Sequence, residues 1–447
     1  MPRDSWICEN CLGAMADLAR RSAAAVWHPC TQMKQHESTP LVEVHRAEGA
    51  WLYDAEGRRL LDAISSWWVN LLGHGQPDIR AALHEQLEQV QHVMLAGFTQ
   101  APVVELSERL AQLAPGTLGH CFYASDGACA VEIALKMSAH YWLNVGKARK
   151  TRFAMLENGY HGETLGALSV TDVALFRQAY GALLRPADRL PSPAPRAGEP
   201  RAVAGERALA ALASHLERHA DETAALIVEP LVQCAGGMAM YDAHYLHKAR
   251  QLCSKFAVHL IADEIAVGFG RTGTMFACEQ AEVAPDFLCL SKGITGGVLP
   301  LSVVMTTPEV YAAFYEERTE RGFLHSHSYS GNALACRAAL AVLQVLERDR
   351  VLERNRELRA WVNERCEPLR RHPAVRDFRN TGMIWAFELE GREPAGKFSA
   401  KFSEQAREAG VVLRPLGRTV YWMAPYCVGR AEMEFLVSAL ERLLPRA

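Results

Sequence analysis

Short apolar runs alternate with amphipathic stretches along the middle of the chain. The apolar runs lie at 121–125, 151–157, 224–230, 258–264 and 286–293. Such runs are typical of central strands in a parallel sheet that is covered on both faces. Stretches with helical apolar spacing lie between them, at 128–146, 205–220 and 242–256. This alternation predicts an α/β fold with a doubly wound, mostly parallel sheet.

The two ends of the chain follow other patterns. Residues 51–66 predict a hairpin that turns at Asp54-Ala55-Glu56-Gly57. We also expect helices near 77–92, 102–114, 332–348 and 351–371, a Pro/Ala-rich surface loop at 185–205, and half-exposed strands at 383–390 and 419–425. The expected organisation is an N-terminal tail (1–25), an N-terminal segment packing with a small domain (26–75), a large domain (76–330) and a small α+β domain (331–447).

Composition excludes several classes of protein. Of the 447 residues, 49% are hydrophobic and 22% are charged, as in an ordinary globular enzyme. The net charge of −3 offers no basic field that would attract nucleic acid. No apolar run is long enough to span a bilayer, and the N-terminus lacks the apolar core of a signal peptide. We therefore expect neither nucleic acid nor membrane as a partner.

The cysteines carry two further expectations. All 12 are scattered without a regular framework, which favours reduced thiols and a cytoplasmic location. Cys8 and Cys11 form a CxxC motif, but a zinc ribbon would need a second pair, and the chain has none at similar spacing. We expect no metal site.

Polar side chains and glycines follow five of the predicted strands. They are Ser125-Asp126-Gly127, the segment from Glu157 to Gly162, Glu229-Pro230, Asp263-Glu264 and Ser291-Lys292-Gly293. In open α/β sheets, ligands bind beyond the carboxyl ends of the strands. These groups are therefore expected to meet in one site.

Lys292 and Asp263 are the strongest catalytic candidates. Lysine is scarce in this chain, and Lys292 directly follows a buried-type run, so desolvation would lower its pKa and free the amine as a nucleophile. Asp263 ends the preceding strand and could hold a proton on a ring nitrogen. The structural alternatives are a surface lysine at a strand end and a helix N-cap.

Two weaker signals complete the pattern. Gly127 and Ala128 lie between a strand and a helix start, where backbone N–H groups suit a phosphate, although any strand–turn–helix corner looks the same. Tyr160 lies in a glycine-flanked loop and could stack on a planar cofactor or pack for structural reasons. Together with the lysine and the aspartate, these features describe a pyridoxal 5′-phosphate site.

The run Leu260–Gly273, followed by Ala284-Pro285-Asp286 and Ser291-Lys292-Gly293, resembles the class III pyridoxal-phosphate aminotransferases of fold type I. The resemblance covers roughly residues 26–430. It implies a mixed, mostly parallel sheet in a large cofactor-binding domain and a smaller α+β domain. It also implies that Lys292 forms the internal aldimine and moves the substrate proton, that Asp263 pairs with the pyridine nitrogen, and that Tyr160 lies by the ring.

The same resemblance implies a homodimer with active sites at the interface. Gly127 and Ala128 would bind the cofactor phosphate. His327 and Ser328, in the run from His325 to Asn332, look like the phosphate-binding loop that the partner subunit contributes.

Other motifs resemble the members of this class that act in biotin biosynthesis. They are Trp27-His28-Pro29, Ser65-Ser66-Trp67-Trp68, the run Asn158–Thr164, the run Glu229–Gln233 and Arg414-Pro415-Leu416-Gly417. The resemblance places Trp67, Tyr160, Lys292, Ser326, Arg414 and Cys30 at the substrate. Arg414 would bind the carboxylate of the keto acid, since a guanidinium matches a carboxylate bidentately. A surface ion pair is the alternative for Arg414, and packing is the alternative for one of the two tryptophans, because neighbours on an extended strand face opposite ways.

The implied reaction converts 8-amino-7-oxononanoate to 7,8-diaminononanoate, with S-adenosylmethionine as amino donor, in a ping-pong cycle through pyridoxamine phosphate. Lysine as donor is one alternative, and another class III ω-amino acid or diamine aminotransferase is a second. A cofactor-binding sensor without activity would need a fused partner domain.

Three positions depart from the family pattern. Asp126 occupies a position that is often serine, and we expect its carboxylate to cap the following helix instead of repelling the phosphate. Cys30 replaces a tyrosine near the substrate, which leaves the amino donor open. Ala333 replaces a frequent proline.

Overall fold

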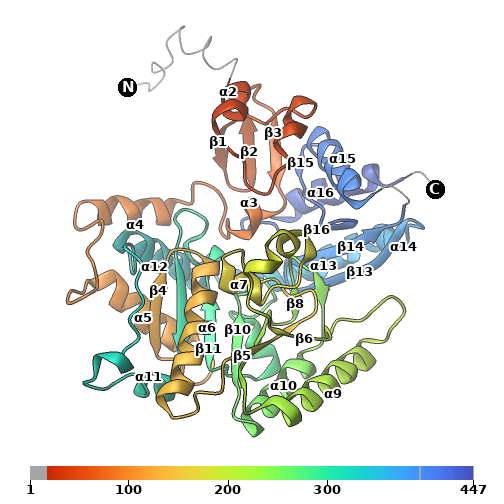
Figure 1. Ribbon diagram of the computed structural model, residues 1–447. Helices are drawn as coiled ribbons and strands as arrows, with labels where there is room; N and C mark the ends of the chain where they lie inside the picture. Colours follow the sequence, from red (N-terminus) through yellow and green to blue (C-terminus); the bar gives the residue numbers. More distant parts are fainter. Residues whose placement is uncertain (1–17, 392–393, 446–447) are drawn as a thin grey trace.

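The computed structural model describes residues 18–391 and 394–445. Its central feature is a seven-stranded sheet in the order β4-β12-β11-β10-β7-β5-β6 (Figure 1). The strands are β4 (His120–Ala124), β5 (Arg152–Leu156), β6 (Asp188–Leu190), β7 (Thr223–Val228), β10 (His259–Asp263), β11 (Phe287–Leu290) and β12 (Ser302–Thr306). β12 pairs antiparallel with both β11 and β4, and the other pairings are parallel. The mixed, mostly parallel sheet confirms the expected fold class.

Apolar side chains cover both faces of this sheet. On one face, α6 (Gly127–Asn144) packs against alternate residues such as Met155, Ile227 and Ile261. On the other face, the next residues along the strands, such as Leu226 and Leu260, pack under α5, α9, α10 and α12. These helices are α5 (Ala101–Leu113), α9 (Arg201–His219), α10 (Ala243–Lys255) and α12 (Ala333–Arg348). Burial on both faces explains why the strands are apolar throughout.

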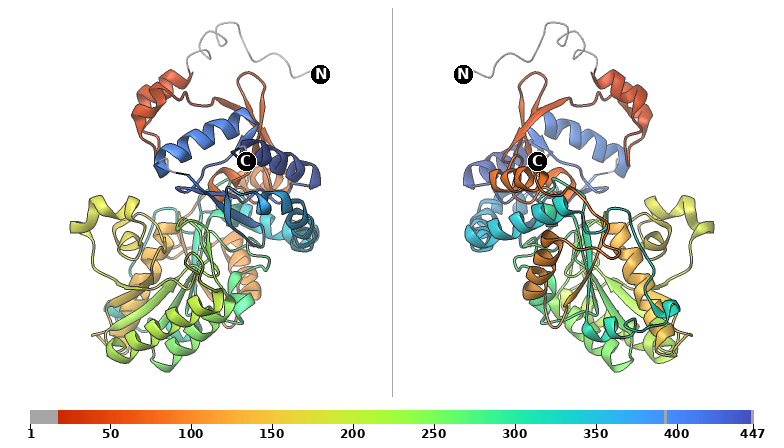
Figure 2. Two further views of the ribbon diagram at one scale, coloured as in Figure 1. Left: turned by 90° about the vertical axis from the view of Figure 1, so that its right-hand side faces the viewer. Right: turned by 90° about the vertical axis from the view of Figure 1, so that its left-hand side faces the viewer.

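Two smaller sheets lie above the large one in Figure 1. The first has the order β1-β2-β3-β15 and joins residues from both ends of the chain. Its strands are β1 (Val44–Glu48), β2 (Trp51–Asp54), β3 (Arg59–Asp62) and β15 (Val411–Val412). The second sheet has the order β13-β14-β16, with β13 (Val375–Thr381), β14 (Ile384–Leu389) and β16 (Thr419–Trp422). Figure 2 shows the N-terminal hairpin beside the C-terminal helices α15 (Ala395–Glu408) and α16 (Arg430–Leu443) in both side views.

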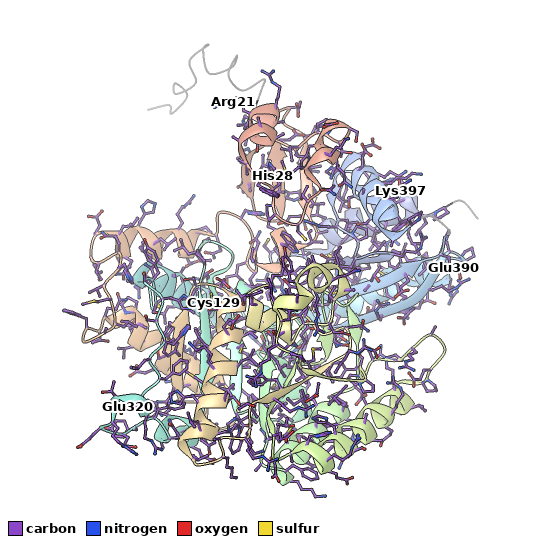
Figure 3. All side chains as sticks on the ribbon, viewed as in Figure 1. Arg21, His28, Cys129, Glu320, Glu390 and Lys397 are labelled. Atoms are coloured by element: carbon purple, nitrogen blue, oxygen red, sulfur yellow. The ribbon has the colours of Figure 1, made fainter. Side chains whose placement is uncertain are left out.

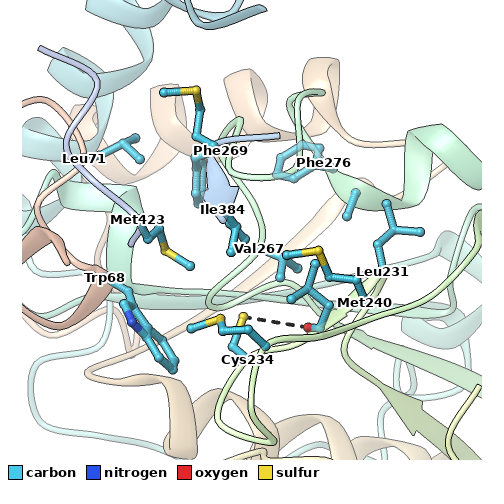
Figure 4. Close-up of a cluster of buried hydrophobic side chains, with 14 of the residues drawn as sticks. Trp68, Leu71, Leu231, Cys234, Met240, Val267, Phe269, Phe276, Ile384 and Met423 are labelled. Atoms are coloured by element: carbon cyan, nitrogen blue, oxygen red, sulfur yellow. Dashed lines mark hydrogen bonds between the residues drawn. The ribbon is translucent and has the colours of Figure 1, made fainter. Parts of the chain in front are cut away.

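One hydrophobic core joins the large sheet to both ends of the chain. Figure 4 shows the cluster, which includes Trp68, Leu71, Val267, Phe269, Ile384 and Met423. Because three distant parts of the sequence contribute to it, this core fixes how the N-terminal segment lies over the carboxyl edge of the large sheet.

The remaining elements are short or lie at the periphery. They are α2 (Leu18–Ala25), α3 (Ser65–Trp68), α4 (Pro77–Leu87), α7 (Leu165–Ser169), α8 (Ala174–Arg177), α11 (Pro308–Ala312), α13 (Val351–Arg365), α14 (Glu367–Arg371), β8 (Val232–Gln233), β9 (Ala239–Met240), and the 3₁₀ turns Met33–Glu37, Gln178–Leu183, Ala277–Ala281, Lys292–Thr295 and Thr319–Arg321. Among the described residues, no helix is both long and apolar enough to cross a membrane.

Several local expectations were wrong. The segment 185–205 is not a continuous loop, because it contains the edge strand β6 and the first turn of α9. The helix expected at 351–371 is interrupted at Cys366, just before Pro368, and forms α13 and α14. The hairpin ends at Asp62, and the last residues of the expected tail form α2. Cys8 and Cys11 lie outside the described residues.

Candidate active site

A cavity of about 530 Å³ lies at the carboxyl edge of the large sheet. The ends of β4, β5, β7, β10 and β11 all reach it, as the strand-end argument predicted. Its lining includes Ser125, Asp126, Gly127, Ala128, Tyr160, His161, Gly162, Glu163, Glu229, Asp263, Ser291, Lys292 and Trp68. The structure therefore brings together Lys292, Asp263, Tyr160, Gly127 and Ala128 from four separate segments.

Lys292 follows β11 and extends into this cavity. Its backbone has a φ of +44°, a left-handed conformation that turns the chain sharply at the strand end. Its amine lies 4.9 Å from the centre of the Trp68 ring. Burial lowers the pKa of Lys292, and the negative charge of Asp263 partly opposes this effect. The surroundings thus favour a neutral, nucleophilic amine, and the alternative of an exposed surface lysine does not hold.

Asp263 is buried at the end of β10 and is held from two sides. Its Oδ2 lies 2.7 Å from Nδ1 of His161, and its Oδ1 accepts a hydrogen bond from the Ile265 N–H at 3.1 Å. The segment after Asp263 is a turn and not a helix, so it does not cap a helix. His161 itself is buried, and its Nε2 has no hydrogen-bond partner among the described residues. The arrangement fixes the orientation of a buried carboxylate at the edge of the cavity.

Two further carboxylates surround the Tyr160 loop. Buried Glu229 accepts hydrogen bonds from the backbone N–H groups of Tyr160 and Cys234, both at 2.9 Å. Burial, with the charge of Asp263, raises the pKa of Glu229 to about 7. The Tyr160 hydroxyl donates to Oε1 of Glu163 at 2.9 Å, and burial raises the pKa of that phenol. Glu229 thus anchors the loop, while Glu163 places an acceptor at the cavity.

The start of α6 forms the other wall of the cavity. Asp126 is the N-cap, and its Oδ1 accepts a hydrogen bond from the Cys129 N–H at 3.0 Å. The carboxylate therefore caps the helix, as expected for this departure from the family pattern. Cys129, labelled in Figure 3, marks this first turn. A methyl group on Gly127 would come within 2.9 Å of the Ile265 side chain, so the tight wall here requires glycine.

The two tryptophans lie in an unusual turn. Ser65, Ser66, Trp67 and Trp68 all have positive φ values, of 51°, 45°, 71° and 75°. A left-handed conformation costs on the order of 1–2 kcal/mol per non-glycine residue, so the surroundings must hold this turn in place. Trp68 is buried and lines the cavity, whereas Trp67 is 40% exposed and is not among the lining residues. As expected, one tryptophan of the pair is buried and the other is exposed. The cause is the left-handed turn, however, and not the alternation of an extended strand.

Arg414 lies beside Trp67. Its guanidinium carbon is 4.5 Å from the centre of the Trp67 ring, and Nη2 donates to the backbone oxygen of Cys30 at 2.7 Å. A second cavity, of about 810 Å³, is lined by Asn158, Asp172, Phe176, Arg177, Arg189, Leu416 and Gly417, among others. The Tyr160 ring, which contacts Phe176 at 5.4 Å, lies between the two cavities. Cys30, Trp67 and Arg414 thus contact one another, and none of the three is among the residues that line either cavity.

The loop that carries Ser326, His327 and Ser328 is not part of this lining. Ser326 and Ser328 are exposed, and the His327 ring contacts His325, with their Nε2 atoms 3.1 Å apart. The backbone oxygen of Ser328 lies 2.7 Å from Nε2 of His92. Within one chain, these three residues therefore stay apart from Lys292 and Asp263.

Sequence reasoning missed two contributors to the site. The contact of His161 with Asp263 could have been suspected, because His161 directly follows Tyr160 in the glycine-rich loop. Trp68 was not distinguished from Trp67, because a left-handed turn leaves no periodic signal in the sequence.

A lysine amine, a buried carboxylate and a helix start around one cavity, at the carboxyl edge of a mostly parallel sheet, define a pyridoxal-phosphate enzyme of fold type I. Residues 32–444 match the family described as aminotransferase class-III. The chain therefore belongs to the class III aminotransferases and is a pyridoxal-phosphate-dependent enzyme that transfers amino groups.

Relatives resemble the chain over almost its whole length. The adenosylmethionine-8-amino-7-oxononanoate aminotransferase of Helicobacter pylori is 44% identical over 436 residues, which cover 96% of this chain and 98% of the relative. A crystal structure of the enzyme of that name from Methanocaldococcus jannaschii is 34% identical in sequence and superposes with a TM-score of 0.90. The match covers 96% of this chain and 98% of that one. An amine transaminase from an uncultivated Pseudomonas species, solved with pyridoxal phosphate bound, is 32% identical, with a TM-score of 0.88 and coverage of 94% and 98%.

The residues of the cavity fit this cofactor. The lowered pKa of Lys292 suits attack on an aldehyde, and buried Asp263 offers a negative charge for a protonated ring nitrogen. The side-chain-free wall at Gly127 lets a phosphate approach the start of α6. The volume of about 530 Å³ is within the usual range for a cofactor site.

Proposed function

We propose that the protein catalyses the biotin-pathway step in which 8-amino-7-oxononanoate receives an amino group and becomes 7,8-diaminononanoate. The observation that carries the proposal is the 44% identity over nearly the whole chain to an adenosylmethionine-8-amino-7-oxononanoate aminotransferase. The contact between the Arg414 guanidinium and the Trp67 ring, 4.5 Å from its centre, supports it, because the pair offers a flat surface and a carboxylate-binding group together next to Trp68, which lines the cavity. S-adenosylmethionine is the proposed donor.

Pyridoxal phosphate, when bound, supplies a carbonyl that takes up the amino group and a ring that accepts the electron pair of the broken C–H bond. In our proposal Lys292 is the residue that would hold the cofactor in the resting enzyme. The neutral Nζ of Lys292 would also take the proton from the substrate carbon that carries the amino group and hold it for return. Burial keeps the amine neutral enough for both tasks.

Asp263 is proposed to keep a proton on the ring nitrogen. Its carboxylate is buried and oriented by Nδ1 of His161 at 2.7 Å, so it would stabilise the protonated ring nitrogen without first shedding water. Gly127 and Ala128 at the start of α6 would bind the phosphate with backbone N–H groups, and Tyr160 would lie by the ring.

The two substrates differ in shape and charge, and the site offers a group for each. Arg414 would bind the carboxylate of 8-amino-7-oxononanoate. The Glu163 carboxylate, which also lines the cavity, would attract a cationic donor. The adjoining cavity of about 810 Å³ leaves space for a bulky adenosyl group. Cys30 lies against Arg414 through its backbone oxygen, and we place it at the substrate on that ground.

We further propose that a second copy of the chain completes the site. Ser326, His327 and Ser328 lie on a partly exposed loop outside their own cavity, which is where a loop serving a partner subunit would have to be. In this proposal His327 and Ser328 reach the phosphate of the partner, Ser326 reaches its substrate, and the homodimer acts in the cytoplasm.

Mass spectrometry of the reaction mixture tests the assignment. The holoenzyme is incubated with S-adenosylmethionine and 8-amino-7-oxononanoate, and 7,8-diaminononanoate is quantified. We expect steady product formation, and for Arg414→Ala a KM for the oxononanoate that is raised at least about tenfold, since a charge-assisted pair is lost. Turnover of simple ω-amino acids without any 7,8-diaminononanoate would refute the assignment.

A further inference from the structure

Asp62 is a buried carboxylate whose role the mechanism above does not include. It ends β3, and only Ala63 and Ile64 separate it from the left-handed turn that carries both tryptophans. Its Oδ1 accepts a hydrogen bond from the Ser66 N–H at 2.8 Å, and its Oδ2 accepts one from the Ser66 hydroxyl at 2.7 Å. Nε2 of His74 lies 3.1 Å from Oδ2. The side chain is completely shielded from solvent.

The same residue also lies beside the strand that leads to Arg414. β3 and β15 pair in parallel, with Asp62 opposite Val412, and the Leu61 N–H donates to the Gly410 oxygen at 2.8 Å. Arg414 follows Val412 by two residues. Asp62 thus connects the turn of the tryptophans with the segment that carries the arginine.

The turn has specific consequences for the cavity. It brings the Trp68 ring to 4.9 Å from the Lys292 amine and the Trp67 ring to 4.5 Å from the Arg414 guanidinium. Because its four residues have positive φ, the turn would relax to negative φ without contacts that hold it. The bonds from Ser66 to Asp62 fix the turn at its second residue.

We propose that Asp62 is a positioning residue: through Ser66 it holds the left-handed turn that sets Trp67 against Arg414 and Trp68 against Lys292. Burying a carboxylate away from solvent costs folding free energy, and an apolar side chain would fill the same space at a lower cost. The presence of a carboxylate here therefore indicates that its two oxygens are needed as hydrogen-bond acceptors. The buried Arg271 also contacts this turn, since its Nη2 donates to the Trp68 backbone oxygen at 3.5 Å.

The inference rests on the proposed substrate contacts of Trp67 and Arg414. The test therefore uses the holoenzyme and the acceptor that the wild type turns over best, whether that is 8-amino-7-oxononanoate or another carbonyl acid. Four variants are compared: Asp62→Ala, Asp62→Asn, Ser66→Ala, and the double variant Asp62→Ala with Ser66→Ala. Asp54→Asn is the matched control, because Asp54 is also buried, caps the turn of the same hairpin through Arg58, and lies outside both cavities.

We expect Asp62→Ala to raise the KM of the acceptor about tenfold while kcat changes less than about threefold, since binding geometry and not chemistry is disturbed. Ser66→Ala should raise KM about threefold, and the double variant should be no worse than Asp62→Ala alone, because Asp62 acts through Ser66. Asp62→Asn can still accept the hydrogen bond from the Ser66 N–H, so its KM for the acceptor should stay within about threefold of the wild-type value. Asp54→Asn should lower the melting temperature and leave KM unchanged.

The inference is overturned if Asp62→Ala leaves KM within about twofold of the wild type, if the effects of Asp62→Ala and Ser66→Ala multiply in the double variant, or if Asp54→Asn raises KM equally. Should Asp62→Ala not fold, the same criterion applies to Ser66→Ala alone. If the wild type does not accept 8-amino-7-oxononanoate, the proposed function fails while the Asp62 comparison is still decided with the other acceptor.

Discussion

Replacing Asp263 by asparagine probes the centre of the site with a minimal change in shape. The new amide keeps an oxygen for the Ile265 N–H, which donates to Oδ1 at 3.1 Å. It loses the negative charge that lies 2.7 Å from Nδ1 of His161, and it places an NH₂ group opposite that ring nitrogen. The cavity itself remains the same size.

The expected size of the effect follows from the burial of this group. Asp263 is 4% exposed, so little solvent screens its charge. Removing one member of a buried charge pair costs about 3–5 kcal/mol. If the lost partner is the protonated ring nitrogen, kcat/KM falls about 150-fold to 5,000-fold. His161→Gln removes the orienting ring but leaves the carboxylate, so its kcat/KM should fall only about tenfold.

The assay is a half-reaction in which the cofactor absorption of each variant is followed after addition of the amino donor. Cofactor content and the melting temperature are measured in parallel, so that loss of binding or of folding is separated from loss of rate. A kcat/KM for Asp263→Asn within tenfold of the wild type, in a variant that retains its cofactor, would refute the role given to this carboxylate.

Three further predictions follow from single contacts. Lys292→Ala should lower turnover by at least about 10⁴-fold, and borohydride reduction followed by peptide mass spectrometry should no longer find the cofactor attached to the chain. Gly127→Ala should weaken cofactor binding about fivefold to tenfold in a titration, because the methyl group would lie 2.9 Å from the Ile265 side chain and move it toward the phosphate; unchanged affinity would contradict this. Burial lowers the pKa of His259 to about 4. As the pH is lowered from 6.5 to 4, the unfolded chain therefore takes up a proton that the folded chain does not, and the free energy of unfolding decreases by up to about 3 kcal/mol. His259→Gln should flatten that part of a denaturation series, and an unchanged slope would contradict the assignment.

The sequence alone predicted the large sheet and the convergence of its strand ends because both follow from local pattern. Continuous apolar runs indicate buried strands, and in a parallel sheet all carboxyl ends meet at one edge. Lys292 and Asp263 could therefore be placed in one site without coordinates. The sequence analysis missed β12 (Ser302–Thr306) altogether. Its antiparallel direction could not have been predicted either, since periodicity carries no information on strand direction.

The missed features depend on contacts between distant parts of the chain. The left-handed turn at Ser65–Trp68 exists because it is held by Asp62 and by groups such as the Met423 oxygen, to which the Ser65 hydroxyl donates at 2.7 Å across 358 positions in the sequence. No local propensity favours four such residues in a row. The three-residue strand β6 was read as loop for a similar reason, because its pairing with β5 and not its composition defines it.

The most direct test of the account is a stepwise reaction of the purified holoenzyme. The enzyme is first converted with S-adenosylmethionine, and separately with lysine, while the cofactor spectrum is recorded. Free amine is then removed, and 8-amino-7-oxononanoate is added. The account predicts that S-adenosylmethionine changes the spectrum, that the oxononanoate restores it, and that about one 7,8-diaminononanoate forms per active site. Conversion by lysine alone would keep the reaction and replace the donor. A spectrum that responds to a simple ω-amino acid but to neither of these donors, with no 7,8-diaminononanoate formed, would contradict the proposed function.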